Sequence, residues 1–505
     1  MNESIYQKIE IAKNGTKIPL LKSGKTLESR YNPERDAETL CNSLDTAARF
    51  FLVLGIGSGI FINKLLEKYK DCFIIGLELY QNDIDFLNQL EAVKEAAKQT
   101  NVRFCTLETL FDTLTNNYLP GKFGDLKILE QRVWLAENQN HIDEIKYIIN
   151  HAVGIISADY SVQAHFGKIW MKNILQNSLL AEKTCNRLPE LSTTEKAKTA
   201  LIVAAGPSLE KSINLFKDKI INRDELYIIA TDTAFSTLNK KGIESDAVIS
   251  IDGQNVSYNH FIKAYEQTSQ AAKYDKTRFF FDLCANHSAA KKLFESNFQL
   301  SFFCSGHPLA SAINNSNNNS LPYLFSGAGT VTITALDFAI KSGFTKIKIL
   351  GADFAYLNGK AYTYGTYLES LYKKAANHIL NFETLFDKLM FRTPLTEKAD
   401  RKTTQVLEAY KESLNTYLTQ NNASFRIEND VYIINLEKNT NPVLQKNTTF
   451  KLSNFLEKFK SSKAEETEII LLPYIAWLKN NKKFKDESYS NLLKLAFNTI
   501  VSYNI

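Results

Sequence analysis

The chain has 505 residues, of which 44% are hydrophobic and 23% are charged, and it carries a formal net charge of +5 at pH 7. These proportions are typical of a folded globular protein and exclude the disordered and fibrous classes, while the length predicts about three domains. The positive charge is small and scattered, so we expect neither nucleic-acid nor membrane binding.

The N-terminus and the cysteines indicate a cytoplasmic protein. The first residues, "MNESIYQKIEIAKNGTK", lack the basic and apolar regions of a signal peptide, and no later apolar run approaches 18 residues. The six cysteines form no close pairs, which argues against a zinc site and a disulfide framework. The chain also has no evident cluster of histidines and carboxylates, so we expect no metal site.

The first predicted unit is a Rossmann-like α/β segment from Phe50 to about Leu129. The run "FFLVLGIGSG" predicts a strand and a turn, "IFINKLLEKYK" a helix, and "CFIIGLELY" a second buried strand. The loop Gly55–Gly59 is followed by Glu78 at the end of that second strand, an arrangement that resembles the S-adenosylmethionine loop of methyltransferases. A lone glycine motif is a weak signal, because any α/β unit needs small residues at its first turn.

Helical patterning follows from about Ile142 to Leu191, with Trp170, Ile174 and Leu175 spaced as one core face, and predicts a connector. A second α/β series begins at Lys196. We expect its strands in "TALIVAAG", "LYIIATD", "DAVISID", "TRFFFDL" and "KIKILGAD", with helices in "VSYNHFIKAYEQTSQ" and "TVTITALDFAIKSG". Continuous apolar strands separated by helices predict a parallel sheet that is covered on both faces.

The rest of the chain completes three predicted domains. The polar run Asn314–Ser320 predicts an exposed loop. Helices return after about Pro394, "VYIINL" predicts a last strand, and only helices follow from about Thr449. We therefore expect an N-terminal α/β domain with its connector at 1–195, a catalytic α/β domain at 196–440 and a helical domain at 441–505.

The turn after the strand "TALIVAAG" is the first candidate site. Gly206 frees the backbone to turn, Pro207 sets φ for a first helical turn, and Ser208 can cap the helix, whose free N–H groups could receive a phosphate. Taken alone this is only a plausible turn. The turn becomes a stronger candidate for a ligand site because other polar groups are expected at the carboxyl ends of the strands of the same sheet, where open α/β sheets bind ligands.

Four such groups follow in the sequence. Asp232, Asp252 and Asp353 each stand where a predicted strand ends, although any one of them could simply cap a helix. The glycine turn formed by Gly327, Ala328, Gly329 and Thr330 opens onto a helix N-terminus and could take an anionic or hydroxyl-rich group of a nucleotide.

Two tyrosines, Tyr356 and Tyr362, flank the turn Asn358-Gly359. A phenol is a neutral donor that can stabilise a departing phosphate. Simple packing beside the turn is an equally good explanation from spacing alone, since the chain contains 23 tyrosines.

The ordered set "LIVAAGPSLEKS", "IIATDTAF", "DAVISID", "GAGTVTITALDFAIKSGFTKIKILGADFAY" and "NGKAY" resembles the central domain of the Maf (motility-associated factor) proteins. That domain is similar to bacterial sialyltransferases that use CMP-sialic acid. The resemblance spans about Lys196 to Leu436, and "ESRYNPERDAE" at Glu28–Glu38 resembles the N-terminal region of the same proteins. It implies a sialyltransferase-like catalytic domain that attaches pseudaminic or legionaminic acid from a CMP-activated donor to Ser or Thr of flagellin in the cytoplasm.

The resemblance also implies roles for residues. Gly206, Pro207 and Ser208 match the Gly-Pro-Ser turn of the nucleotide site, and Tyr356 and Tyr362 match the pair that holds the leaving phosphate if one residue is inserted after Phe354. Asp232 and Thr233 stand where the sialyltransferases have a donor-contacting Asn, so the position matches and the residue type does not. The donor-binding residues expected in full are Gly206, Pro207, Ser208, Asp232, Thr233, Asp252, Gly327, Gly329 and Thr330.

The general base of the predicted site has more than one candidate. The sialyltransferases use a His downstream of the tyrosine pair, and His378, in the predicted helix "KKAANHILNFETLF", is the only His beyond Tyr362. If His378 is a surface or core residue instead, Asp232, Asp252 or Asp353 could deprotonate the acceptor.

The implied reaction is a single in-line displacement with inversion that needs no cofactor and no metal ion. Three alternatives stay open: a pterin pyrophosphokinase, which resembles the same Ala-Gly-Pro-Ser core, an S-adenosylmethionine-dependent methyltransferase, and a non-catalytic flagellin-binding protein.

Overall fold

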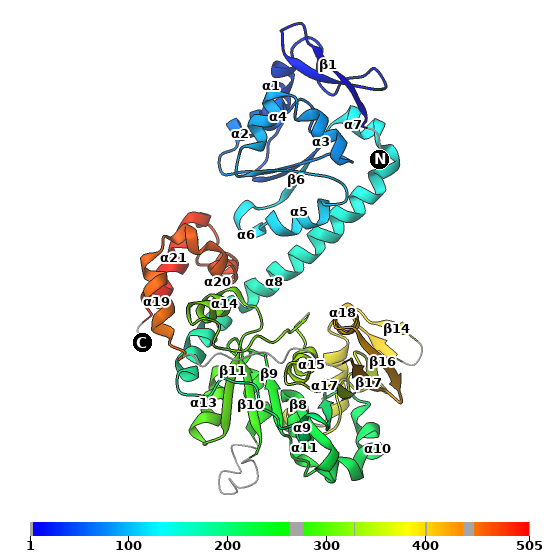
Figure 1. The fold of residues 1–505 in the computed structure, drawn as a ribbon, viewed down its shortest axis with the longest axis vertical. Helices are drawn as coiled ribbons and strands as arrows, with labels where there is room; N and C mark the ends of the chain where they lie inside the picture. The colour runs from blue at the N-terminus through cyan, green and yellow to red at the C-terminus, as the bar shows by residue number, and fades with distance from the viewer. Residues whose placement is uncertain (1–3, 263–275, 328, 399–400, 438–448, 504–505) are drawn as a thin grey trace. The chain divides into compact units, whose positions relative to one another are not determined.

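The computed structural model describes residues 4–262, 276–327, 329–398, 401–437 and 449–503. The chain divides into two compact units (Figure 1): one comprises Met1–His165 and Pro473–Leu492, and the other comprises Phe166–Leu472 and Leu493–Ile505. The domain boundary predicted at residues 195–196 stays a prediction, and the one at 440–441 lies outside the described residues.

The first unit contains a four-stranded parallel sheet in the order β5-β4-β3-β6 and an antiparallel hairpin, β1-β2. The central strand β3, Phe50–Leu54, is buried at all five positions, as its unbroken apolar run predicts. The strands are β1 (Tyr6–Ile11), β2 (Lys17–Leu21), β3 (Phe50–Leu54), β4 (Phe73–Leu77), β5 (Val102–Cys105) and β6 (Leu126–Glu130). The helices are α1 (Pro33–Ser43), α2 (Ile60–Lys68), α3 (Gln81–Leu87), α4 (Glu91–Ala97), α5 (Leu110–Asn117), α6 (Pro120–Phe123), α7 (Arg132–Glu137) and the short η1 (Gln139–His141).

Helices α8 (Ile142–Ala181), α20 (Glu468–Asn480) and α21 (Tyr489–Val501) each contribute residues to both units. The predicted connector is thus a single helix of 40 residues that ends ten residues before the expected Leu191. Within the described residues, no helix combines the length and the apolar character that crossing a bilayer requires.

The second unit is built on an eight-stranded sheet in the order β11-β10-β9-β8-β7-β12-β17-β16. The first six strands are parallel, and β17 and β16 are added antiparallel at one end. The strands are β7 (Thr199–Val203), β8 (Leu226–Thr231), β9 (Ala247–Ser250), β10 (Arg278–Asp282), β11 (Gln299–Phe303), β12 (Lys346–Leu350), β16 (Ala423–Glu428) and β17 (Val431–Leu436). All five strands predicted between Lys196 and Asp353 are confirmed.

The strand order creates a switch point between β7 and β12. Strands β7 to β11 follow one another outward in chain order, and the chain then returns to place β12 on the other side of β7. Loops at the carboxyl ends of such a pair diverge and leave a crevice where ligands bind. The turn containing Gly206 follows β7 and Asp353 follows β12, so the fold places both at this crevice.

Helix α15, Val331–Lys341, packs against β7, β8 and β9, and residues 332–340 are all buried. Burying one large apolar side chain contributes about 1.5–3 kcal/mol, so α15 is a major part of the core that holds these strand ends in register. The other helices of the unit are α9 (Thr193–Lys196), α10 (Leu209–Ile221), η2 (Arg223–Glu225), α11 (Asp232–Lys240), η3 (Asn255–Phe261), α13 (His287–Glu295), α14 (Pro308–Ser316), α16 (Tyr367–Ala375), α17 (Phe382–Met390), α18 (Gln405–Gln420), α19 (Leu452–Ser461) and η5 (Ala464–Thr467).

A small antiparallel sheet in the order β13-β15-β14 was not predicted. Its strands, β13 (Tyr356–Leu357), β15 (Arg401–Thr403) and β14 (Thr396–Lys398), have only two or three residues each, too few for a period-2 pattern to show.

The exposed loop predicted at Asn314–Ser320 is wrong in part. Asn314 lies in the last turn of α14 with its side chain buried, donating to the Leu321 carbonyl at 3.1 Å and accepting from the Leu321 amide at 2.9 Å. Asn317 is also buried and accepts from the Lys451 amide at 2.8 Å. Asparagine carries both a donor and an acceptor, so it can pair buried backbone groups where composition alone predicts solvent exposure.

Two further predictions need correction. Strand β11 was missed, because "QLSFF" is short and joins a helical pattern. The helix predicted over "VSYNHFIKAYEQTSQ" begins as a 3₁₀ helix, Asn255–Phe261, and its continuation from residue 263 lies outside the described residues.

Candidate functional site

The turn at Gly206 is fixed by contacts with the end of β12. The Gly206 amide donates to the Gly351 carbonyl at 2.8 Å, and a Cβ at Gly206 would collide with that carbonyl and with the Asp353 carboxylate. Glycine is therefore required here by space. Pro207 is partly buried and leads into α10.

Asp353 caps helix α10 in place of Ser208. Asp353 Oδ2 accepts a hydrogen bond from the Ser208 amide at 2.8 Å, whereas the Ser208 hydroxyl makes no capping bond. The prediction that the Ser208 side chain caps the helix is thus wrong. The Ser208 hydroxyl is buried and has no hydrogen-bond partner among the described residues. Burial raises the pKa of Asp353, and the hydrogen bond from the Ser208 amide opposes that shift.

Asp232 ties the end of β8 to the end of β9. Its Oδ1 accepts from the Thr233 amide at 2.7 Å and from the Thr233 hydroxyl at 3.2 Å, and its Oδ2 accepts from the Ser250 hydroxyl at 2.8 Å. Asp232 is only 3% exposed. Both carboxylate oxygens therefore have partners within the fold.

Asp252 holds the next loop in a similar way. Its Oδ1 accepts from the Gln254 amide at 2.9 Å, and its Oδ2 accepts from the Ser257 hydroxyl at 2.6 Å. These bonds fix the start of η3, which directly follows β9. Asp252 is half-buried, so its outer face is available to a ligand.

The glycine turn before α15 has the backbone that its sequence predicts. Gly327 and Gly329 have φ of +55° and +93°, and the Thr330 hydroxyl caps α15 by accepting from the Thr332 amide at 3.4 Å. A Cβ at Gly327 would lie 2.6 Å from the Ser413 hydroxyl, so the turn packs against α18. Ala328 lies outside the described residues.

The tyrosine loop, defined as residues 356–366, crosses the N-terminal ends of α10 and α11. The Thr363 amide donates to the Ala205 carbonyl at 2.9 Å, and the Tyr364 amide donates to Glu210 Oε1 at 2.8 Å. The Ser236 hydroxyl donates to the Gly365 carbonyl at 2.9 Å. These bonds attach the loop to the turn after β7 on one side and to α11 on the other.

Tyr362 is the centre of a group of phenols and carboxylates. Tyr362 is 37% exposed, and burial of the rest of its side chain, followed by the electrostatic influence of Tyr356, Tyr410, Asp232 and Asp252, raises its pKa to about 12. The hydrogen bonds of the tyrosine loop hold Tyr362 between the turn after β7 and helix α11, which begins at Asp232. With a pKa of about 12, Tyr362 stays protonated at neutral pH and is a neutral hydrogen-bond donor.

Two tyrosines of this group were not predicted. Tyr367 begins α16, and the charges of Tyr362, Asp252 and Asp232 contribute to its raised pKa after burial. Tyr410 lies on α18, where Asp252 contributes in the same way. No local motif distinguishes either residue, because both belong to ordinary amphipathic helices.

His378 is not in a helix. Helix α16 ends at Ala375 and α17 begins at Phe382, and His378 lies between them in an exposed loop. The Asn377 side chain forms a turn there by accepting from the amides of Ile379 and Leu380. The helical pattern of the sequence was misleading because the Asn377 side chain competes with the helix for these amides.

A different histidine lies beside the tyrosines. His260, in η3, is 5% exposed, and its ring meets the Tyr367 ring edge-on with 4.5 Å between ring centroids. Its Nδ1 is buried without a hydrogen-bond partner among the described residues. In the sequence, the only sign of a functional role for His260 is its position eight residues after Asp252.

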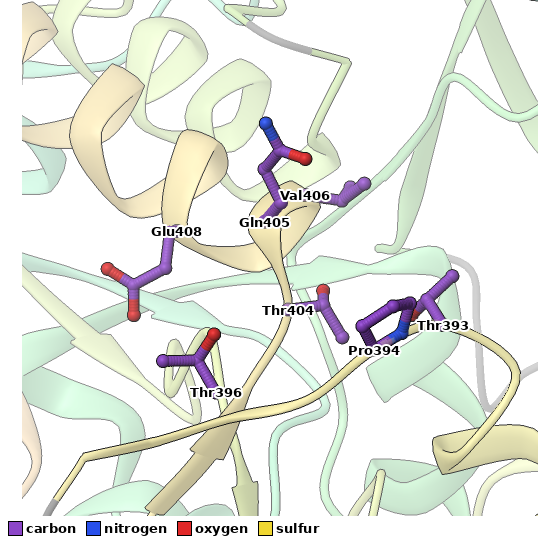
Figure 2. Close-up of a pocket in the computed structure, with 7 residues that line it drawn as sticks. All are labelled: Thr393, Pro394, Thr396, Thr404, Gln405, Val406 and Glu408. Carbon is purple, nitrogen blue, oxygen red and sulfur yellow. The ribbon is translucent and has the colours of Figure 1, made fainter.

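A pocket of about 630 Å³ is lined by seven residues from two segments of the chain (Figure 2). One side is the segment that leads into β14, and the other is the first turn of α18. Strand β15 connects the pocket to the tyrosines, since Lys402 pairs with Tyr356 and the Thr403 hydroxyl donates to the Phe354 carbonyl at 3.1 Å. The lining residues are Thr393, Pro394, Thr396, Thr404, Gln405, Val406 and Glu408.

The glycine loop of the first unit is filled by the protein's own carboxylates. Glu78 accepts from the Ile56 amide at 2.7 Å, the Tyr6 hydroxyl at 2.9 Å and the Trp134 indole at 2.7 Å. Glu28 Oε1 accepts from the Ser58 amide. The loop's amides and the acidic residue that would receive ribose hydroxyls are therefore occupied, which supports a packing role for this loop.

Comparison with known proteins gives three findings. Residues 171–359 match a family described as "6-hydroxymethylpterin diphosphokinase MptE-like". Two uncharacterized proteins of Treponema pallidum (strain Nichols) are 38% identical over 146 residues and 37% identical over 135 residues. These stretches cover 29% and 26% of this chain, and 67% and 48% of the two relatives. The chain belongs to the same family as the first of them.

The third finding concerns the fold. A solved structure described as a Maf glycosyltransferase from Magnetospirillum magneticum AMB-1 matches with a TM-score of 0.54 at 11% identity, over 99% of this chain and 91% of that one. The chain therefore has the fold of a Maf glycosyltransferase. This match confirms the predicted α/β fold class and, as a similarity of fold, the predicted resemblance to the Maf proteins.

Proposed function

We propose that the second unit is a glycosyltransferase, and that it moves a nonulosonic acid of the pseudaminic or legionaminic type from a CMP-activated donor to Ser or Thr hydroxyls of flagellin. The observation that carries the proposal is the attachment of the tyrosine loop to the turn after β7, through the Thr363 amide, and to α11, which begins at Asp232, through the Gly365 carbonyl. The Gly206 turn lies at the switch point of the sheet, in a fold shared with a Maf glycosyltransferase.

In this proposal the tyrosines hold the leaving phosphate. The bond between the anomeric carbon and the phosphate oxygen breaks, and the electron pair leaves on CMP. The Tyr356 and Tyr362 hydroxyls donate to the phosphate, and because they are neutral they favour the charge that develops there over the ground state. This arrangement needs neither a metal ion nor a further cofactor.

The nucleotide is placed along the strand ends. The rigid turn at Gly206 and Pro207, the Ser208 hydroxyl, and the loops that begin at Asp232 and Asp252 form one side of the donor site. The turn containing Gly327, Gly329 and Thr330 forms the other. Asp353 contributes by capping α10, and it is a positioning residue in this scheme.

The acceptor hydroxyl attacks the anomeric carbon from the face opposite the phosphate, which inverts the configuration, and it loses its proton to a base. Asp232 and Asp252 are engaged at both oxygens, and Asp353 is engaged by Ser208. We propose His260 as the proton acceptor instead of the exposed His378, because His260 lies beside Tyr367 within the tyrosine group.

Thermal shift measurements with CMP, ATP and S-adenosylmethionine test the donor site. A ligand at 100 times its Kd stabilises the folded state by about 2.7 kcal/mol. CMP should raise Tm, and the Tyr356→Phe/Tyr362→Phe double variant should show a smaller rise. Stabilisation by ATP alone would favour the pterin diphosphokinase chemistry of the matched family, and stabilisation by S-adenosylmethionine alone would favour a methyltransferase.

A further inference from the structure

We propose that Glu369 is a positioning residue for the transfer reaction, and that it holds the tyrosine loop in the conformation in which Tyr362 can donate to the leaving phosphate. This inference rests on the proposed function, because it names a residue that acts through the same tyrosine. Glu369 lies in the first turn of α16, and it is only 4% exposed.

The backbone that directly follows Tyr362 is held at three consecutive amides. The Thr363 and Tyr364 amides donate to the turn after β7 and to the first turn of α10. The third amide, that of Gly365, donates to Glu369 Oε2 at 2.8 Å, and this hydrogen bond is buried. Because water does not reach a buried amide, loss of Glu369 would leave it unpaired and release the loop at this point.

The surroundings of Gly365 make the position of the loop exact. Gly365 has φ of +106°, and a Cβ on it would lie 3.2 Å from the backbone and the hydroxyl of Thr237 in α11. The Ser236 hydroxyl donates to the Gly365 carbonyl at 2.9 Å, so the amide and the carbonyl of this residue are both held. A change at the amide is therefore transmitted along the loop to Tyr362, three residues earlier.

Two lysines fix the Glu369 carboxylate in turn. Lys240 Nζ of α11 lies 3.4 Å from Glu369 Oε2, and Lys373 of α16 pairs with the other carboxylate oxygen. A buried carboxylate needs such partners, because burial disfavours an unpaired charge. Two ammonium groups accompany one carboxylate, so this arrangement adds no net negative charge beside a site proposed for an anionic donor.

Glu210 of α10 is the weaker attachment of the same loop. Its side chain is 36% exposed, and its ion pair with Lys360, at 3.2 Å, is accessible to solvent. Exposed pairs of this kind contribute little because water and salt screen them. Water can also replace Glu210 at the Tyr364 amide, so we expect Glu210→Ala to have a smaller effect than Glu369→Ala.

A double-mutant cycle with Tyr362 tests the assignment. CMP release in the presence of flagellin and the CMP-activated donor is measured for the full-length protein, for Glu369→Ala, for Tyr362→Phe and for the double variant. The matched control is Asp246→Ala. Asp246 also accepts from a backbone amide, that of Ile228 at 2.7 Å, and pairs with Arg223, but it directly precedes β9 and so lies at the end of the strands opposite the site.

Hydrogen exchange measured on the same variants reports the loop itself, without substrate. The measured peptide contains the Thr363, Tyr364 and Gly365 amides. If Glu369→Ala does not fold, Glu369→Gln takes its place, because it keeps an oxygen for the Gly365 amide and removes the ion pairs. We expect changes of the same sign and smaller size from the Gln variant.

A misplacement of about 1 Å can cost about 10²-fold in rate. We expect Glu369→Ala to lower kcat about tenfold or more in the unaltered background and about twofold or less in the Tyr362→Phe background, because the loss acts through that tyrosine. Exchange of the loop amides should rise about tenfold in Glu369→Ala, and Asp246→Ala should leave both exchange in the loop and kcat within about twofold.

Equal fold losses in the two backgrounds, or unchanged exchange in the loop, would overturn the inference. The failure of this inference is distinguishable from the failure of the proposed function. No transfer by the unaltered protein rejects the proposed function and with it the role of Glu369, whereas transfer with equal losses in both backgrounds rejects only the role of Glu369.

Discussion

Replacement of Asp353 separates a positioning role from a catalytic one. Asp353→Ala removes the acceptor of the buried Ser208 amide, and an unpaired buried donor costs about 1–3 kcal/mol. For a unit of this size we expect Tm to fall by about 1–5 °C. Asp353→Asn keeps a carbonyl oxygen for the Ser208 amide, and it removes a carboxylate whose pKa burial already raises, so we expect a cost below about 1 kcal/mol.

The activity of the Asn variant decides between the two roles. As a positioning residue, Asp353 tolerates Asn with a loss of transfer rate below about tenfold, whereas loss of a general base costs about 10²–10⁴. The assay is CMP release in the presence of flagellin, together with melting curves for both variants. A folded Asn variant with a rate reduced by more than a hundredfold would refute the capping role and restore Asp353 as a base.

Three further predictions follow from the contacts. Tyr362→Phe should lower kcat by about a hundredfold through loss of one phosphate donor, while Tyr364→Phe, on the solvent side of the same loop, should stay within about twofold of the unaltered protein in the same CMP-release assay. His260→Gln should lower kcat by about 10²–10⁴, and His378→Gln should leave kcat unchanged; the reverse pattern would return the base to His378. Burial raises the pKa of Glu78 to about 8, so the protonated carboxyl favours folding at low pH. That contribution, at most about 5 kcal/mol, is lost as pH rises from about 4.5 through 8. Glu78→Gln should therefore reduce the fall in Tm between pH 5 and 9, and a fall in Tm equal to that of the unaltered protein would contradict this prediction.

The sequence predicted β3, β4, β7, β8, β9, β10 and β12 because these strands are buried on both faces, but it did not predict β1, β2, β5, β6, β11 or β16. In β7, residues 200–203 are all buried, so an unbroken apolar run marks the strand without any need for tertiary information. The two-residue strand β13 and the buried Asn314 escaped prediction for the opposite reason. Their conformations depend on partners far along the chain or on single side-chain hydrogen bonds, which no periodicity records.

For the candidate site, the sequence predicted the positions of several residues but not their hydrogen-bonding partners. Gly206, Asp232 and Asp252 could be found because each follows a strand whose end the pattern marks, and their place at one sheet edge follows from a parallel topology. Their hydrogen-bonding roles could not be found. Nothing in the sequence shows that Asp353, 145 residues after Ser208, would cap α10, or that His260 would pack against Tyr367.

Intact-mass spectrometry of flagellin tests the central claim most directly. Purified flagellin is incubated with the full-length protein and a CMP-activated nonulosonic acid, with the Tyr356→Phe/Tyr362→Phe double variant in parallel. We predict that flagellin gains mass in steps of one nonulosonic acid residue, that CMP is released in equal amount, and that the double variant slows both. Flagellin that keeps its mass while the intact donor persists would contradict the assignment of this site as a CMP-sugar glycosyltransferase.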